Sequence, residues 1–488
     1  MAAEKQLNNE DLELTNSGDR SPEAVSSSDI YIDPVAEKKL LFKLDLVLTP
    51  LIGLLYLVSF LDRSNIGNAK IQGMPEDLGL VGSQFNVATS IFYITYCLFE
   101  TPMALLLKII RPSRMIPCAV IAWSLCTIFT CFVHNYAGLV AVRLIMGACE
   151  AGLFPSLNLY LTMVYKREEQ SKRLSYLFTA AAVSGAFGGL IAYGISHMDG
   201  VGGYAGWRWL YIIEGAFSIL VAVLVYFTLP DDPKLAWFLN EDERALVRAR
   251  QEITARYRGS EEFDWAETRK AARDPKVWLS AVIQFCADIS LYGFSTFLPA
   301  IIRAMGYSSV HAQLLTVPVY LFGSFTFIVV AIIADRTKKR FGILLVMSII
   351  MIIGYILFLT VTKAGVLYFA TFLIAAGVYI GPGLNLGWLN INVAGHYKRA
   401  TAVGIQQSLG NLGGVVAGQI YYQSPRYWVG YGTSVGAMGV AVVGYVFMYI
   451  HLKRLNAERD RVEQTPGADA SNFAGKTGDE ELEFRYQF

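Results

Sequence analysis

The chain has 488 residues, of which 54% are hydrophobic and only 17% are charged, against about 25% charged residues in an ordinary soluble protein. Such a chain cannot cover itself with polar surface, so a soluble globular protein is excluded. The formal net charge of +1 gives no overall field for binding nucleic acid, and no nucleic-acid partner is expected.

Along the chain, a polar segment comes first and is followed by a series of apolar stretches. Residues 1–38 are rich in Ser, Asp and Glu, so we expect a disordered tail without a cleavable signal peptide. The apolar stretches approach the roughly 20 residues that cross a bilayer. They predict an all-α membrane protein with transmembrane helices near 42–61, 84–107, 115–133, 138–163, 173–196, 208–229, 277–302, 311–334, 341–361, 365–391, 400–422 and 430–452.

Lys and Arg gather in the even-numbered connections between these twelve helices, which predicts that both termini are cytoplasmic. Residues 231–275 are strongly charged and predict a cytoplasmic linker with short amphipathic helices at the membrane surface. The linker divides the membrane part into an N-terminal six-helix bundle at 39–230 and a C-terminal six-helix bundle at 276–455. Residues 456–488 are predicted to be a second disordered cytoplasmic tail.

Small residues recur at matching places in the two halves, as in transporters built from internal repeats. The fifth helix contains Gly185, Gly188 and Gly189, and the eleventh contains glycines at four-residue spacing, Gly410, Gly414 and Gly418. Small residues at such spacing predict that these helices approach their neighbours closely.

Four segments carry a family resemblance: FLDRSNIGNA at 60–69, RLIMGACEAGLFP at 143–155, GWRWLYIIEG at 206–215, and FLP, GYS and QLLTVPVY between 297 and 320. Over residues 40–455 the chain resembles the major facilitator superfamily, and within it the fungal allantoate permease branch of the anion:cation symporters. The resemblance implies a monomeric carrier in the plasma membrane of a fungal cell. It would import a small organic anion, such as a vitamin acid or ureido acid, with protons by alternating access.

The resemblance also points to gating residues in the loops. The loop after helix two has Lys108, Arg111 and Arg114 but lacks the Asp-Arg pair of the family signature. The second-half loop is better preserved, so the cytoplasmic gate is assigned to Asp335, Arg336 and Arg340. Asp62 and Arg63 are expected to close helix one at the outer surface, either as an external gate or as a solvated helix end.

Helix four carries two ionisable residues on one face, Arg143 and Glu150, and such residues within a membrane usually serve function. Arg143 could hold a substrate carboxylate with two hydrogen bonds, and Glu150 could load and release a proton. The alternative is an ion pair that only ties helices together.

Helices seven, ten and eleven present polar stripes. Asp288 in helix seven is a second candidate for the proton site, with hydrogen bonding to a neighbouring helix as the alternative. Candidate substrate contacts, which could equally hold helices together, are Tyr292, Asn385, Trp388, Asn392, Gln407 and Asn411. Glu100 and Glu214 rank below Glu150 because they lie toward helix ends.

No metal or cofactor site is expected, since no histidine stands in a ligand pattern and none of the six cysteines forms a C-x-x-C pair. No nucleophile motif, zinc motif or phosphate loop is present, so an enzyme is not expected. The alternatives to uptake are efflux of a small metabolite by the same fold, a sensor that binds solute without transporting it, and, as the least favoured class, a membrane enzyme.

Overall fold

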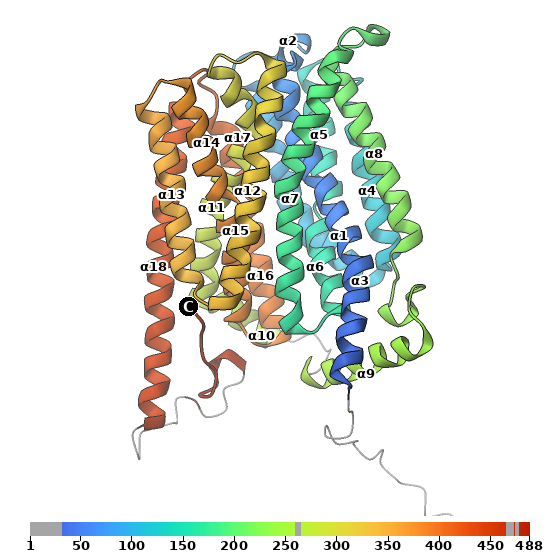
Figure 1. Ribbon diagram of the computed structural model, residues 1–488, viewed down its shortest axis with the longest axis vertical. Helices are drawn as coiled ribbons and strands as arrows, with labels where there is room; N and C mark the ends of the chain where they lie inside the picture. Colours follow the sequence, from blue (N-terminus) through green and yellow to red (C-terminus); the bar gives the residue numbers. More distant parts are fainter. Residues whose placement is uncertain (1–31, 259–264, 465–472, 474–477) are drawn as a thin grey trace, which may run out of the picture.

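The computed structural model describes residues 32–258, 265–464, 473 and 478–488. Over these residues the chain is helical and contains no strand, so the all-α class is confirmed (Figure 1). The α-helices are α1 Pro34–Ile71, α2 Met74–Asp77, α3 Gln84–Ile109, α4 Pro112–Thr130, α5 Tyr136–Glu150, α6 Leu153–Val164, α7 Arg167–Ile195, α8 Gly206–Thr228, α9 Glu241–Arg258, α10 Trp265–Arg273, α11 Pro275–Ala304, α12 Ser309–Thr337, α13 Arg340–Thr360, α14 Ala364–Val378, α15 Ile380–Ile391, α16 His396–Asn411, α17 Gly413–Ile420 and α18 Trp428–Gln464.

Most of these helices run along one axis of the molecule (Figure 1). We call the end that contains α2 the upper end and the end that contains α9 and α10 the lower end. Ten stretches in the described residues are helical, long and apolar enough to cross a membrane. The protein is therefore an integral multi-pass membrane protein. The helices α3, α16 and α17 pack among these ten, with α3 against α5 and both α16 and α17 against α11.

The first helix is longer at both ends than predicted. It begins at Pro34, where the Asp33 carboxylate accepts hydrogen bonds from the amides of Val35 and Ala36, so the predicted tail is too long; residues 1–31 lie outside the described residues. The helix continues to Ile71, so the placement of Asp62 and Arg63 at its outer end is wrong. Both side chains are buried, because neighbouring helices supply partners for their charges.

Three of the predicted helices are divided, and the eleventh, at 400–422, is interrupted at Leu412 between α16 and α17. The fourth is broken between α5 and α6 at Gly152, where a Cβ atom would lie 2.6 Å from Cβ of Met103. The tenth is broken between α14 and α15 at Tyr379. The interruption lies just before Gly381, Pro382 and Gly383, and Pro382 has no amide hydrogen to donate to the preceding turn.

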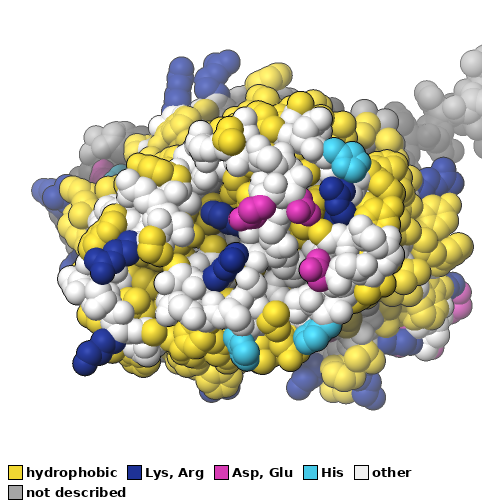
Figure 2. All heavy atoms as spheres, turned by 90° about the horizontal axis from the view of Figure 1, so that it is seen from above, with side chains coloured by type: hydrophobic (Ala, Val, Ile, Leu, Met, Phe, Trp, Pro, Cys, Tyr) yellow, Lys and Arg dark blue, Asp and Glu magenta, His cyan; other side chains and the backbone are white. Residues whose placement is uncertain are grey.

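Glycines join the two helix sets in the upper half. A Cβ atom on Gly189 of α7 would lie 2.4 Å from Thr316 Oγ1 of α12. Another on Gly418 of α17 would lie 2.3 Å from Ser90 Oγ of α3. The predicted close approach is thus confirmed at both places, which we call the glycine seams. At the upper end, acidic and basic side chains gather near the centre of the face (Figure 2).

The predicted linker is helical on both sides of residues 259–264, which lie outside the described residues. The helix α9 is fastened to the N-terminal half through Lys43 and Glu243, whose Nζ and Oε2 are 2.7 Å apart. In the C-terminal half, Glu267 of α10 accepts a hydrogen bond from the amide of Tyr397 at 3.0 Å. Each linker helix is therefore attached to a different half.

The prediction of a wholly disordered C-terminal tail is wrong. The helix α18 extends to Gln464, and residues 478–488 fold back onto the C-terminal half. Polar composition misled the prediction, because these residues find their polar partners on other helices of the C-terminal half. Residues 465–472 and 474–477 of the predicted tail lie outside the described residues.

Candidate functional site

A cavity lies between the two halves, and we call it the central cavity. It contains about 340 Å³ of empty space and is open on part of its boundary. Its wall combines aromatic rings with polar side chains from both halves. The lining residues are Tyr56, Phe60, Arg63, Tyr96, Phe154, Phe178, Gln284, Asp288, Leu291, Tyr292, Pro382, Gln407 and Asn411.

The N-terminal half contributes a buried ion pair to this cavity. Arg63 lines the cavity, and its Nε donates to Oε1 of Glu150 at 2.5 Å. Ser59 Oγ donates to the same oxygen at 2.6 Å, while Glu150 Oε2 is buried and has no hydrogen-bond partner among the described residues. The guanidinium carbon lies 4.6 Å from the ring centre of Tyr96, a distance suited to a cation–π contact. The cation is therefore held by one carboxylate oxygen and by aromatic rings.

The C-terminal half supplies a hydrogen-bonded polar wall. Tyr292 donates its hydroxyl to Asn411 Oδ1 at 2.6 Å, and the amide nitrogen of Gln284 lies 3.3 Å from Asp288 Oδ2. Asn411 Nδ2 in turn donates to Glu100 of the N-terminal half at 3.4 Å. Four of the predicted residues, Asp288, Tyr292, Gln407 and Asn411, thus line the central cavity together.

An aromatic contact separates the central cavity from a second one. Phe178 and Phe327 face each other across the two halves with ring centres 6.1 Å apart. Beside them, a Cβ atom on Gly383 would lie 2.9 Å from the Phe327 ring, so α15 passes close to the contact. Phe178 lines both cavities. It therefore occupies the boundary between them.

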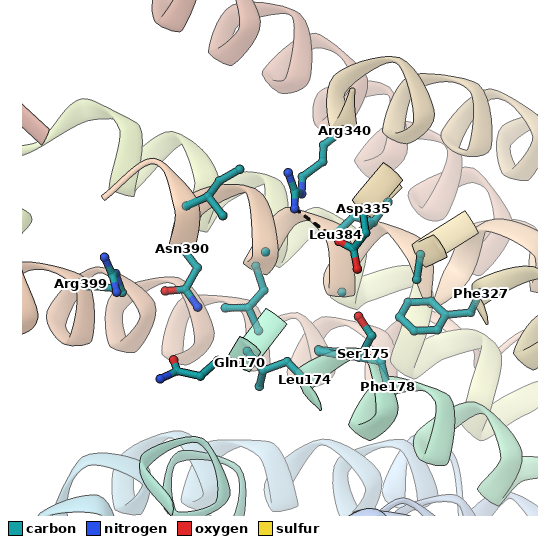
Figure 3. Close-up of a pocket in the computed structure, with 15 residues that line it drawn as sticks. Gln170, Leu174, Ser175, Phe178, Phe327, Asp335, Arg340, Leu384, Asn390 and Arg399 are labelled. Atoms are coloured by element: carbon teal, nitrogen blue, oxygen red, sulfur yellow. Dashed lines mark ion pairs between the residues drawn. The ribbon is translucent and has the colours of Figure 1, made fainter. Parts of the chain in front are cut away.

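The second cavity, which we call the lower cavity, contains about 670 Å³ of empty space that is partly open to solvent. Figure 3 shows Gln170, Leu174 and Ser175 of α7 facing α12, α13 and α15 across it. Asp335 and Arg340 line it and form an ion pair at 3.6 Å. The predicted gating residues Asp335 and Arg340 therefore meet, whereas Arg336 is exposed and is not among the lining residues.

Other predicted residues lie outside the central cavity. The Arg143 guanidinium carbon is 4.8 Å from the Phe92 ring centre, and its Nε donates to the Ala88 carbonyl at 3.4 Å. Asn385 Nδ2 donates to the carbonyl of Ser280 at 3.0 Å, which fastens α15 to α11. Trp388 and Asn392 donate to the carbonyl of Gln487 at 2.8 and 2.9 Å. The side chains of Asn385, Trp388 and Asn392 are thus hydrogen-bonded to backbone carbonyls of the protein itself.

Asp62 faces a different part of the N-terminal half from its neighbour Arg63. Its Oδ2 accepts from Trp123 Nε1 at 3.0 Å and from Ser218 Oγ at 3.3 Å. Neither Asp62 nor Glu214 is among the residues that line the central cavity, although both are fully buried.

Sequence reasoning placed Arg63 at the outer end of helix one and ranked Glu100 below Glu150, so it assigned neither residue to this region. A usable signal was the spacing of Tyr56, Ser59, Phe60 and Arg63, which puts all four on one helical face. For Glu100, the amide ligand Asn411 comes from the other half, so no local pattern reveals the contact.

Comparison with known proteins agrees with this architecture. Residues 52–418 match the family model described as the Major Facilitator Superfamily. An uncharacterized transporter of Schizosaccharomyces pombe is 50% identical over 457 residues, covering 93% of this chain and 91% of that protein. The chain is also 35% identical to a high-affinity nicotinic acid transporter of Saccharomyces cerevisiae, over 93% of this chain and 85% of that one.

Among solved structures, the chain is similar in fold to a D-xylose-proton symporter, with a TM-score of 0.62 at 14% identity, covering 83% of this chain and 97% of that one. The matched family model spans most of the membrane region, and the curated relatives match along nearly their whole length. The chain therefore belongs to the major facilitator superfamily and is a transporter related to the fungal permeases of the anion:cation symporter type.

Proposed function

We propose that this transporter takes up a small organic monocarboxylate together with protons by alternating access. In this proposal the membrane is crossed twelve times, by the ten stretches above, by α3 and by the α16–α17 pair. Both termini and the lower end are cytoplasmic, and the chain works as a monomer in the plasma membrane. The concentration of Lys and Arg in the even-numbered connections supports this orientation.

The observation that carries the proposal is the Arg63–Glu150 pair. A guanidinium can hold a carboxylate through two parallel hydrogen bonds. In the structure, a single Glu150 oxygen engages Arg63 Nε, so the cation is only partly satisfied by its internal partner. Arg63 also lines the central cavity, which Arg143 does not. We therefore assign the carboxylate-binding role to Arg63 in place of Arg143.

The same pair suggests how protons and anions are coupled. A substrate carboxylate that approaches Arg63 competes with the Glu150 carboxylate and adds a second negative charge to a buried site. Protonation of Glu150 removes both obstacles, because the neutral carboxyl releases the cation and keeps the net charge unchanged. Binding one proton with each monocarboxylate therefore keeps the charge of the buried site constant, and this stoichiometry costs less desolvation energy than binding the anion alone. Asp288 is the second candidate for the proton site.

The remaining wall favours a solute that is partly aromatic or rich in amide groups. Tyr56, Phe60 and Tyr96 offer ring surface, whereas Gln407 and Asn411 offer amide groups. The 35% identity with a nicotinic acid transporter supports a vitamin acid or a ureido acid as the substrate.

The test is uptake of labelled nicotinate, pantothenate and allantoate into cells that lack their own carriers, at external pH of about 5 and about 7.5. We expect one acid to accumulate above its external concentration at the lower pH, and a protonophore to abolish this accumulation. Equal uptake at both pH values, or uptake that stops at equilibrium, would refute proton coupling. Export of a preloaded acid without uptake would establish efflux instead.

A further inference from the structure

The lower end of the C-terminal half carries a basic surface that binds the last described part of the chain. This surface brings together Lys276 at the start of α11, Lys398 in α16 and Arg459 in α18. The residues bound to it, Gly478–Phe488, have the sequence GDEELEFRYQF, which is acidic and aromatic. We call this segment the C-terminal strap.

Asp479 is the anchor of the strap. Its Oδ2 lies 2.7 Å from Lys276 Nζ and 2.9 Å from Lys398 Nζ, and its Oδ1 accepts from the amide of Ala394 at 3.2 Å. The residue is fully buried. Burial alone would raise the pKa of Asp479, but the two ammonium groups outweigh it and lower the pKa.

The end of the strap is bound through its backbone. Asn392 Oδ1 accepts from the Gln487 amide at 2.8 Å, and the Gln487 carbonyl accepts from Trp388 Nε1 at 2.8 Å. The Phe488 carbonyl accepts from the Arg340 amide at 2.8 Å, and its ring lies 5.3 Å from that of Tyr449. The strap thus connects α15 to α13 and α18.

Contacts with α18 keep the strap close to the helix that precedes it. Arg459 Nη2 donates to the Asp479 carbonyl at 2.8 Å, and Asn456 Nδ2 donates to the Tyr486 carbonyl at 2.9 Å. These partners are separated by only 20 and 30 positions in the chain. The loop that must be closed is therefore short, and its closure costs little entropy.

The helix α15 lies between the strap and the lower cavity. Leu384, Leu386 and Asn390 of this helix line the cavity, whereas Trp388 and Asn392 bond to the strap. The helix is interrupted at Tyr379, and Pro382 removes one hydrogen-bond donor from the next turn, so this junction is a point at which α15 can bend relative to α14. The contacts of its lower end with the strap therefore add to the bond by which Asn385 fastens α15 to α11.

We propose that the C-terminal strap is a clamp that holds α15 in place and so sets the shape of the lower cavity. The clamp engages through Asp479 and releases when that anchor is lost. If the strap only covered the surface of the C-terminal half, its removal would leave the position of α15 unchanged.

The test compares hydrogen exchange in the full chain and in a chain lacking residues 478–488, both in lipid nanodiscs. We expect amides in the 380–391 region to exchange at least tenfold faster without the strap, while those in the 153–164 region are unchanged. A synthetic peptide of residues 478–488 should restore protection, and the same peptide with Asp479→Asn should bind at least tenfold more weakly. Unchanged exchange of the 380–391 region in the deleted chain, or a peptide that binds without protecting this region, would overturn the proposal.

If the chain lacking residues 478–488 does not fold, the test uses full-length Asp479→Asn instead. This variant keeps the backbone contacts of the strap. Faster exchange confined to 380–391 and the strap would support the clamp. Exchange equal to that of the unaltered chain would refute it. Glu483→Gln is the matched control, since it removes one acid of the same segment whose side chain has no role in the contacts above.

Discussion

Arg63 of α1 donates from Nε to Glu150 of α5 at 2.5 Å, with side chains that are 7% and 0% exposed. Breaking a buried ion pair by removing one partner typically costs about 3–5 kcal/mol, because the other charge is left without compensation. Loss of either partner is therefore expected to destabilise the N-terminal half. The same pair is the proposed site at which the proton and the substrate anion bind.

Glu150→Gln should mimic a permanently protonated site. We expect substrate to exchange across the membrane at a rate within about threefold of the unaltered protein, while accumulation driven by acid outside is lost, because no proton can be released. The measurement compares substrate exchange with acid-driven accumulation in reconstituted vesicles.

The control for this variant is Glu241→Gln, which removes an exposed acid of the linker helix α9 and should leave both modes unchanged. Full acid-driven accumulation by Glu150→Gln would contradict its coupling role and direct the search to Asp288. Loss of expression without any change in coupling would indicate a purely structural pair.

Arg63→Lys should weaken substrate binding by about tenfold or more, even though the charge is kept, because a lysine cannot supply the planar two-bond fork. Arg143→Lys is the matched comparison, since Arg143 is also buried but does not line the central cavity. Binding is measured by displacement of labelled substrate from detergent-solubilised protein. An equal loss in both variants would remove the distinction between the two arginines.

Gly418→Ala should hinder closure of the upper end. The added Cβ atom would lie 2.3 Å from Ser90 Oγ and 3.0 Å from the Ser90 backbone nitrogen, so α3 and α17 must separate. We expect reagents from outside to label a cysteine placed at Ser90 at least about threefold faster in this variant. Gly436→Ala is the control, because a Cβ atom there meets nothing within 4 Å. Equal labelling would show that the seam does not limit access.

Asp335→Ala should impair the exchange between inward-open and outward-open states. Its carboxylate pairs with Arg340 at the lower cavity, and such a pair can hold one state and break in the other. We expect transport to fall by about tenfold with substrate affinity kept within about threefold. Normal transport at normal expression would exclude this ion pair from the cycle.

The proposed orientation predicts which segments a protease can reach in intact cells. An epitope inserted at 259–264 and one at either terminus should be protected, whereas one at 200–203, near the upper end, should be cleaved. Permeabilised cells provide the control for epitope integrity. Cleavage of the linker epitope from outside would refute the six-plus-six topology.

The strap should remain docked across the physiological pH range. The pKa of Asp479 is lowered in the folded chain, since Lys276 and Lys398 outweigh its burial. Its contribution is therefore fully present above the unfolded pKa of about 3.9 and is lost only as pH falls through the lower folded value.

Peptide binding to the strap-deleted chain should therefore be constant from about pH 7.5 to about pH 5 and weaken below about pH 4. The other charged or titratable groups around the anchor include Asp274, at 3.4 Å from Lys276 and 3.2 Å from Lys398, Glu480, at 3.6 Å from Lys398, Arg459, and His451, which interacts electrostatically with Lys276. Binding that weakens between pH 7 and 5 would assign the anchoring role to a group other than Asp479.

The helical architecture could be read from the sequence because apolar length and glycine spacing are local properties. Gly189 and Gly418 pack where close approach was predicted. The first helix was cut short at Asp62 because a charged residue ordinarily ends an apolar span. Here, Trp123 and Ser218 bury that charge from helices far along the chain.

The candidate site was only partly predictable for the same reason. Asp288, Tyr292 and Asn411 were found from stripes on single helices, and they line one cavity. Glu150 was recognised, but its partner Arg63 on α1 was predicted as an external gating residue and not as a contact of Glu150. Trp388 and Asn392 look like substrate ligands in isolation, and only the distant Gln487 reveals another use.

The separate docking of α9 and α10 limits how far the halves can move apart. With Arg258 and Trp265 ending and beginning the two linker helices, the connection between them spans at most about 25 Å when fully extended. The linker at 231–275, in which 20 of 45 residues are charged, therefore limits the separation of the two helices that it contains. As long as both helices stay attached, Arg258 and Trp265 cannot be drawn apart beyond that length, and lengthening 259–264 would relax the limit without altering any residue of the central cavity.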